Sequence, residues 1–144
     1  MTSFGRAPDL SVVVAVYNSD HTIDQLLSEL RQVLDPLDRT YEIVLVDDGS
    51  TDQSWGRLKA AAADHQDVRA FRLLRNYGEQ SASLCGLREA RGAVIVTLDD
   101  DLQHPPSEIP LLLDALSGDV DLVYGVPTSM RQHQLRRLAA WLWK

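Results

Sequence analysis

The sequence predicts an α/β fold in which helices cover both faces of a mostly parallel sheet. Two observations predict this fold class. Short β-branched runs alternate strictly along the chain with segments whose apolar residues recur at helical spacing, which indicates right-handed strand–helix–strand crossovers. The first run, Leu10–Val16, is also almost continuously apolar and β-branched, as expected for a strand that is buried on both faces.

Each element follows from its own residues. After a polar lead-in at residues 1–9, Ser19 or Asp20 can cap a helix that carries apolar residues from Ile23 to Leu34 and ends near Asp35-Pro36. The later helices have similar signals. One is an Ala-rich stretch, a second ends at Arg91-Gly92, and a third begins at a proline pair. The predicted strands are Leu10–Val16, Tyr41–Val46, Val68–Leu74, Ala93–Leu98 and Val120–Val126; the later helices are Gln53–Ala63, Glu79–Ala90, Pro105–Gly118 and Gln132–Trp143.

Length and composition favour one soluble domain over 1–144. The formal charge of -7, from 14 basic and 21 acidic residues, argues against a nucleic-acid binder, which needs a basic surface. A single cysteine, Cys85, and the lack of an apolar N-terminal signal region favour a cytoplasmic setting, and no run reaches the ~18–20 apolar residues of a membrane span. The chain stops at Trp141-Leu142-Trp143-Lys144 without a helix stop signal, so we expect the domain to be truncated after residue 144.

Three consecutive carboxylates, Asp99, Asp100 and Asp101, directly follow the apolar run at Ala93–Leu98. Adjacent acids repel one another and are poor strand formers, so their position suggests a cation that neutralises them, Mg²⁺ or Mn²⁺, with Gln103 as a further oxygen ligand. The alternative is a solvated acidic loop. A metal site is the interpretation that we favour, since an exposed loop has no need to follow a buried strand so closely.

Polar residues also follow the first three predicted strands. Asp47 and Asp48 could accept hydrogen bonds from a base or a ribose, or they could cap the following helix. Asn76 and Gly78 could form a sugar-contacting loop or only a turn, and Tyr17 could stack on a base or pack. Ligands bind at the carboxyl ends of parallel strands, so we expect one nucleotide and metal site there.

Four motifs, in order and in register from Leu10 to Lys144, resemble family 2 glycosyltransferases, and in particular the dolichol- or undecaprenyl-phosphate sugar transferases. They are Ala15-Val16-Tyr17-Asn18, Val46-Asp47-Asp48-Gly49-Ser50-Thr51-Asp52, Arg75-Asn76-Tyr77-Gly78-Glu79-Gln80 and Leu98-Asp99-Asp100-Asp101-Leu102-Gln103-His104-Pro105-Pro106. The resemblance implies the Rossmann-like GT-A fold. It also implies an inverting transfer of a sugar from a UDP- or GDP-linked donor to a polyprenyl phosphate in cell-envelope glycan synthesis.

The resemblance also assigns roles to residues. Asp48 matches the residue that holds the base, with Ala15, Tyr17 and Asp47 lining the nucleotide pocket. Asp99 and Asp101 match the Asp-x-Asp metal motif, whose metal neutralises charge on the diphosphate leaving group, and Gln103 matches a glutamine that joins the metal. A phosphate acceptor is already anionic, which fits the absence of an obvious general base.

The chain departs from the family pattern at several positions. Ala15 stands where proline is frequent, and Ser19 where glutamate is. After the predicted fifth strand the family commonly has an arginine for the donor phosphates, whereas this chain reads Gly125-Val126-Pro127, so Arg131 is the candidate substitute.

The last predicted helix, Gln132–Trp143, has two interpretations. Its arginine and tryptophan side chains could meet an anionic membrane surface at the cytoplasmic face, or the helix could pack on the core with a solvated basic face.

Other functional classes predict different patterns. A nucleotide-sugar-binding or partner-binding module without turnover would share the donor motifs. A phosphoacceptor receiver domain would need an acidic pair after the first strand and a Lys after the fifth, and a dinucleotide-binding fold would need a Gly-x-Gly-x-x-Gly turn. The sequence lacks both of these patterns.

Overall fold

A computed structural model of the protein describes residues 7–116 and 118–126. The chain divides into two compact units, Met1–Pro110 and Leu111–Lys144, and each is described by itself. The first unit holds the whole sheet and all residues that line the cavity described below. The predicted helix Gln132–Trp143 and Arg131 lie outside the described residues.

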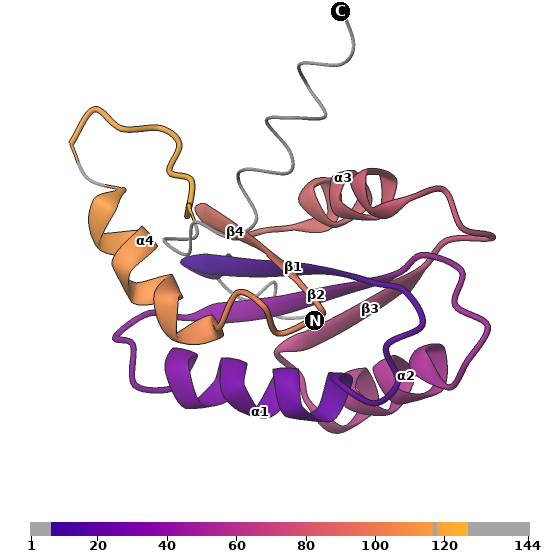
Figure 1. Ribbon diagram of the computed structural model, residues 1–144. Helices are drawn as coiled ribbons and strands as arrows, with labels where there is room; N and C mark the ends of the chain where they lie inside the picture. Colours follow the sequence, from indigo (N-terminus) through magenta and orange to yellow (C-terminus); the bar gives the residue numbers. More distant parts are fainter. Residues whose placement is uncertain (1–6, 117, 127–144) are drawn as a thin grey trace, which may run out of the picture. The chain divides into compact units, whose positions relative to one another are not determined.

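The first unit is built on a four-stranded parallel sheet with the strand order β3-β2-β1-β4 (Figure 1). The strands are β1 (Leu10–Val16), β2 (Tyr41–Asp47), β3 (Val68–Arg72) and β4 (Val94–Asp99). All three pairings are parallel, which confirms the predicted fold class. In register, Val16 lies beside Asp47 and Ala15 beside Asp99, so the polar residues after β1, β2 and β4 emerge at one edge.

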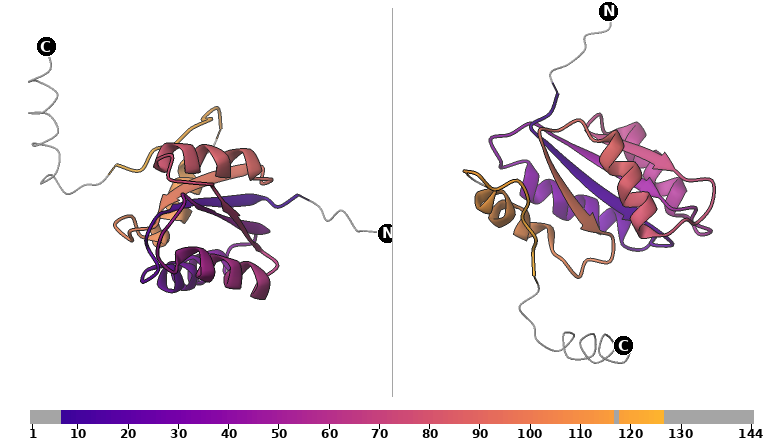
Figure 2. Two further views of the ribbon diagram at one scale, coloured as in Figure 1. Left: turned by 90° about the vertical axis from the view of Figure 1, so that its right-hand side faces the viewer. Right: turned by 90° about the horizontal axis from the view of Figure 1, so that it is seen from above.

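Helices cover both faces of this sheet, as predicted (Figures 1 and 2). Helices α1 (Ile23–Leu34) and α2 (Ser54–Asp64) lie on one face, and α3 (Glu79–Glu89) packs on the other against β1 and β2. The apolar stripe of α1 is buried at Ile23, Leu26, Leu27, Leu30 and Leu34. The central strands β1 and β2 are therefore covered on both sides, which explains why most of their residues are apolar.

The amino end of the sheet carries a buried carboxylate with many partners. Glu42 is 6% exposed, and its carboxylate accepts hydrogen bonds from the Ser11 hydroxyl at 2.7 Å, the Arg91 N–H at 2.7 Å and the Arg69 guanidinium at 3.1 Å. Arg69 also pairs with Glu89 at the end of α3. We call these five residues the Glu42 network. They tie β1, β2, β3 and the end of α3 together.

The second unit begins within helix α4 (Ile109–Ala115), which follows a 3₁₀ turn at Pro106–Glu108. These elements confirm the helix predicted after the proline pair, although it ends before Gly118. The strand predicted at Val120–Val126 is wrong, because this segment has no strand hydrogen bonding. A β-prone sequence becomes a strand only when a neighbouring strand pairs with it, and the described residues offer this segment no partner. No helix within the described ranges is long and apolar enough to cross a membrane.

Candidate functional site

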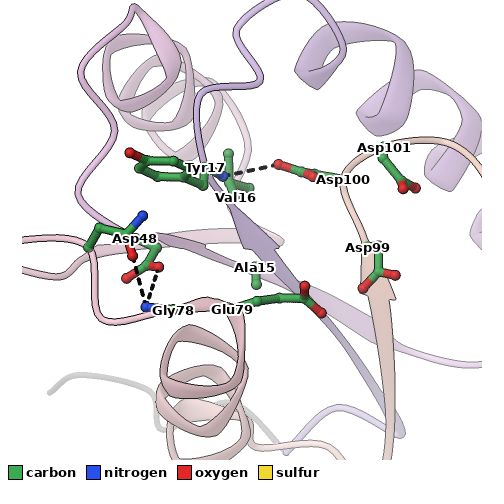
Figure 3. A pocket seen from close by; sticks show the side chains of 10 residues that line it. Ala15, Val16, Tyr17, Asp48, Gly78, Glu79, Asp99, Asp100 and Asp101 are labelled. Atoms are coloured by element: carbon green, nitrogen blue, oxygen red, sulfur yellow. Dashed lines mark hydrogen bonds between the residues drawn. The ribbon is translucent and has the colours of Figure 1, made fainter. Parts of the chain in front are cut away.

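A cavity of about 230 Å³ opens at the carboxyl edge of the sheet in the first unit. The cavity is lined by residues at the ends of β1, β2 and β4 and at the start of α3. Figure 3 shows Tyr17 and Asp48 toward one end, Asp99, Asp100 and Asp101 toward the other, and Ala15 between them. The lining residues are Ala15, Val16, Tyr17, Asp48, Asn76, Gly78, Glu79, Asp99, Asp100 and Asp101.

Asp48 organises the first end of the cavity. Its carboxylate accepts the backbone N–H of Tyr77 at 2.8 Å and of Gly78 at 2.9 Å, while its own N–H donates to the carbonyl of Val16. Asp48 is 2% exposed and joins the ends of β1 and β2 to the loop before α3. A carboxylate that is ionised and held in this way keeps further lone pairs free to accept hydrogen bonds from a ligand.

Gly49 allows the loop before α3 to approach Asp48 closely. Its φ is +70°, and a Cβ at this position would lie 2.5 Å from the backbone carbonyl carbon of Arg75. Any side chain would therefore push the loop of Asn76 and Gly78 away from Asp48. The close approach of this loop thus explains why glycine follows Asp48, in addition to the role of Asp48 as a hydrogen-bond acceptor that the sequence suggested.

Asp47 lies behind the cavity wall and does not line it. Its side chain is fully buried and forms an ion pair with the Arg72 Nε at 3.0 Å, while its other oxygen accepts the N–H of Ser50. Arg72 in turn donates to the Ser50 carbonyl and lies over the Trp55 ring. Asp47 therefore supports the turn that presents Asp48.

Asp52 makes local hydrogen bonds near the start of α2. Its carboxylate accepts the N–H of Ser54, the first residue of α2, and also the N–H of Asp20.

The second end of the cavity is acidic. Asp99 is the last residue of β4, and Asp100 accepts the backbone N–H of Tyr17 at 3.1 Å, which connects the β4 loop to the β1 loop across 83 residues of sequence. Asp101 accepts the N–H of Gln103 at 2.9 Å. Gln103 is exposed and does not line the cavity.

Glu79 is a residue that sequence reasoning missed. It is the first residue of α3, and its side chain extends along the cavity from Gly78 toward Asp99 (Figure 3). The negative charge of Asp99 raises the pKa of Glu79 above its usual range. Partial burial, a hydrogen bond with Asp99 and the charges of Asp100 and Asp101 raise it further. Its position just after Gly78, at the carboxyl edge of the predicted sheet, was the signal that could have found it.

We call Glu79, Asp99, Asp100 and Asp101 the carboxylate cluster. Within the described part of the chain, none of the four forms an ion pair with Lys, Arg or His. No three His, Cys, Asp or Glu side chains among residues 7–116 and 118–126 converge closely enough to hold a metal ion by themselves. Mg²⁺, however, is usually held by one or two carboxylates together with substrate phosphates. A set of hard oxygen donors without a counter-charge therefore fits a divalent cation that binds together with a diphosphate.

The cavity thus brings eight of the predicted site residues into one place. It gathers Ala15, Tyr17, Asp48, Asn76, Gly78, Asp99, Asp100 and Asp101 from segments far apart in the sequence. Asp47 and Gln103 lie outside its lining, and Arg131 lies outside the described residues. This arrangement can accept hydrogen bonds at one end and a positive charge at the other.

Comparison with known families and proteins agrees with this geometry. The family model described as "Glycosyl transferase family 2" matches residues 11–141. An undecaprenyl-phosphate 4-deoxy-4-formamido-L-arabinose transferase of Sodalis glossinidius is 39% identical over 141 residues, which are 97% of this chain and 43% of that protein. The chain therefore spans less than half the length of this curated relative.

Solved structures show the same fold. The mannosyltransferase PcManGT from Pyrobaculum calidifontis, in complex with GDP-Man and Mn²⁺, superposes with a TM-score of 0.67 at 26% identity, over 79% of this chain and 34% of that one. Glucosyl-3-phosphoglycerate synthase from Mycobacterium tuberculosis, in complex with Mn²⁺, UDP and phosphoglyceric acid, gives a TM-score of 0.61 at 26% identity, over 78% of this chain and 40% of that one. Both solved neighbours thus contain a nucleotide and Mn²⁺.

Proposed function

The chain belongs to glycosyl transferase family 2, and we propose that it binds the donor in a metal-dependent, inverting transfer of a sugar from a UDP- or GDP-linked donor to a polyprenyl phosphate or related acceptor. The observation that carries this proposal is the single cavity that joins Asp48 to the carboxylate cluster across the carboxyl edge of the sheet. A nucleotide diphosphate has a matching polarity, with hydrogen-bond donors on its base and negative charge on its phosphates. The curated relative is named as an undecaprenyl-phosphate transferase, which supports the acceptor class.

At the base end, Asp48 accepts hydrogen bonds from the nucleotide. Tyr17, a residue that is 44% exposed, offers a ring beside the base, and Ala15 leaves space between the two ends of the cavity. Asn76 and Gly78 contribute the loop that Asp48 holds in place. Asp47 acts through its ion pair with Arg72, which fixes the turn before Asp48.

At the acidic end, Asp99 and Asp101 would hold the Mg²⁺ or Mn²⁺ that accompanies the donor, with Gln103 as the candidate for a further oxygen ligand. When bound, the cation supplies positive charge that stabilises the diphosphate leaving group. Asp100 keeps the β4 loop against β1 through its contact with Tyr17. Arg131 is our candidate for a positive charge on the donor phosphates.

The acceptor phosphate is anionic near neutral pH and can attack the sugar without a strong general base. The acceptor is a lipid, so we place the reaction at a membrane surface, on its cytoplasmic face, where the segment at Gln132–Trp143 is a candidate contact.

Two assays on the full chain test the proposal. Calorimetric titration with UDP- and GDP-sugars in the presence of Mn²⁺ measures donor binding, and transfer to a polyprenyl phosphate in detergent measures turnover. Metal-dependent binding together with transfer supports the proposed function. Binding without transfer would reduce the chain to a nucleotide-sugar-binding module, and a chain that binds none of the donors would refute both functions.

A further inference from the structure

The carboxylate cluster contains one member that comes from another face of the cavity. Asp99, Asp100 and Asp101 follow β4, whereas Glu79 begins α3. In Figure 3 the Glu79 side chain points across the cavity toward Asp99 and away from Asp48. Glu79 and Asp99 line the same cavity.

The start of α3 is held in this position by the base end of the cavity. Gly78, with a φ of +94°, donates its N–H to Asp48, and its carbonyl accepts the N–H groups of Ser81 and Ala82. Glu79 therefore leaves the backbone at a fixed point between the two ends of the cavity.

Four carboxylates in one place carry a large unbalanced charge. The described part of the chain supplies no basic side chain to any of them, and the N-terminus of α3 offers only a partial positive charge to Glu79. Hydroxyl groups can donate hydrogen bonds to carboxylates but do not neutralise them. A divalent cation does both, since it binds oxygen and removes the repulsion.

We infer that Glu79 is a further cation-binding residue of the donor site. Together with Asp99, it would bind the divalent cation that accompanies the nucleotide diphosphate. This inference rests on the proposed function. It extends that function from the residues after β4 to the first residue of α3, which would hold the cation together with Asp99. Binding of the cation then couples α3 to β4.

Replacement of Glu79 by Gln tests the inference, because it removes the charge and keeps the size and hydrogen-bonding capacity of the side chain. The affinity of the full chain for UDP and for GDP is measured by calorimetry, with Mn²⁺ and in EDTA. Glu79→Gln is expected to reduce the Mn²⁺-dependent gain in nucleotide affinity about tenfold, the size expected for one unit charge near a cation at a solvent-accessible site. Affinity in EDTA should stay equal or rise.

Glu29→Gln is the matched control. Glu29 on α1 is half-buried and lies outside the cavity lining; it accepts one hydrogen bond from Gln25 and loses the same charge on replacement, so the variant should keep the full Mn²⁺-dependent gain. An undiminished gain in Glu79→Gln overturns the inference. An equal loss of affinity with and without Mn²⁺ also overturns it, because it would assign Glu79 to the nucleotide instead.

Measurements on the wild-type protein distinguish a failure of the proposed function from a failure of the inference about Glu79. A wild-type chain that binds neither nucleotide overturns the proposed function itself, and the inference with it. A wild-type chain with metal-dependent binding beside a Glu79→Gln variant with the same dependence overturns the inference alone.

Discussion

Acidic side chains gather at both ends of the parallel sheet, and the two groups differ in their partners. At the amino end, Glu42 is 6% exposed and its carboxylate is held by Ser11, Arg69 and the Arg91 N–H. At the carboxyl end, the carboxylate cluster is open to the cavity and has no ion pair within the described residues. Similar chemical groups are thus compensated at one end and left uncompensated at the other.

The difference separates a structural role from a binding role. A buried charge without a partner is costly, so Glu42 can stay ionised only inside its network. The carboxylate cluster avoids part of this cost through exposure to water, and it remains available for an external cation. Asp47 supports this distinction, because it lies at the carboxyl end but is fully buried and is paired with Arg72.

The largest effect is expected from removal of the positive charge of Arg69 in the Glu42 network. Arg69→Met keeps the aliphatic part of the side chain and leaves Glu42 buried without its ion pair, so the free energy of unfolding should fall by about 3–5 kcal/mol. Urea denaturation at pH 7 measures this change. Arg57→Met is the control, because Arg57 pairs with Asp24 on the surface and such pairs contribute about 1 kcal/mol or less. Equal losses in the two variants would show that the Glu42 network contributes no more than a surface pair.

The second effect concerns the other end of the sheet. Asp101→Ala removes a proposed metal ligand, so the affinity for the nucleotide donor in Mn²⁺ should fall by at least about 100-fold, more than is typical for loss of a residue behind the ligands. Stability in metal-free buffer should stay the same or rise slightly, because repulsion within the carboxylate cluster decreases. Calorimetry with the donor and thermal unfolding in EDTA measure both quantities. An unchanged Mn²⁺-dependent affinity would contradict the role of Asp101.

The sequence was sufficient to predict most of what the central strands and the site motifs show. The apolar runs of β1 and β2 predict burial on both faces, and the residues that follow β1, β2 and β4 predict a shared edge. Asp99, Asp100 and Asp48 indeed meet in one cavity. These predictions succeed because strand direction and side-chain polarity are local properties, and a parallel sheet brings the strand ends together.

Predictions that depend on a non-local partner were less successful. The segment at Val120–Val126 has a β-prone sequence but no pairing strand among the described residues. Strand β3 ends at Arg72, although the predicted strand continued to Leu74, which is 98% exposed. The orientation of Glu79 toward Asp99 also depends on how α3 docks on the sheet. Neither pairing nor docking can be derived from residue spacing alone.

The third prediction uses pH to examine the Glu42 network. Burial opposes ionisation of Glu42, but hydrogen bonds from Ser11, the Arg91 N–H and Arg69 outweigh it and lower the pKa of Glu42 below its usual range near 4.3. The ionised form is therefore favoured in the folded state, and its contribution to stability is present above pH ~4.3 and is lost as the pH falls through the lower, folded-state pKa.

Glu42→Gln should accordingly lower the free energy of unfolding by about 1–3 kcal/mol at pH 7, since the amide leaves buried donors poorly satisfied. The difference from the wild type should shrink as the pH falls below ~4.3, when the wild-type carboxylate also gains a proton. Urea denaturation at pH 7, 5 and 3 measures this trend. A difference that stays constant with pH would indicate a packing effect instead of a charge effect.

The smallest effect is expected from the same substitution at the other end of the sheet. Asp99 and its neighbours raise the pKa of Glu79, so in this case the protonated form is favoured in the folded state and stability decreases as the pH rises through that pKa. In metal-free buffer at pH 7, Glu79→Gln should therefore raise the free energy of unfolding, by less than about 1 kcal/mol because the side chain is exposed to water. Thermal unfolding in EDTA measures the change, and Mn²⁺ together with nucleotide should reverse its sign, since the wild type then gains more from binding. A loss of stability in EDTA would show that Glu79, like Glu42, is a compensated structural carboxylate, and the contrast between the two ends of the sheet would not extend to α3.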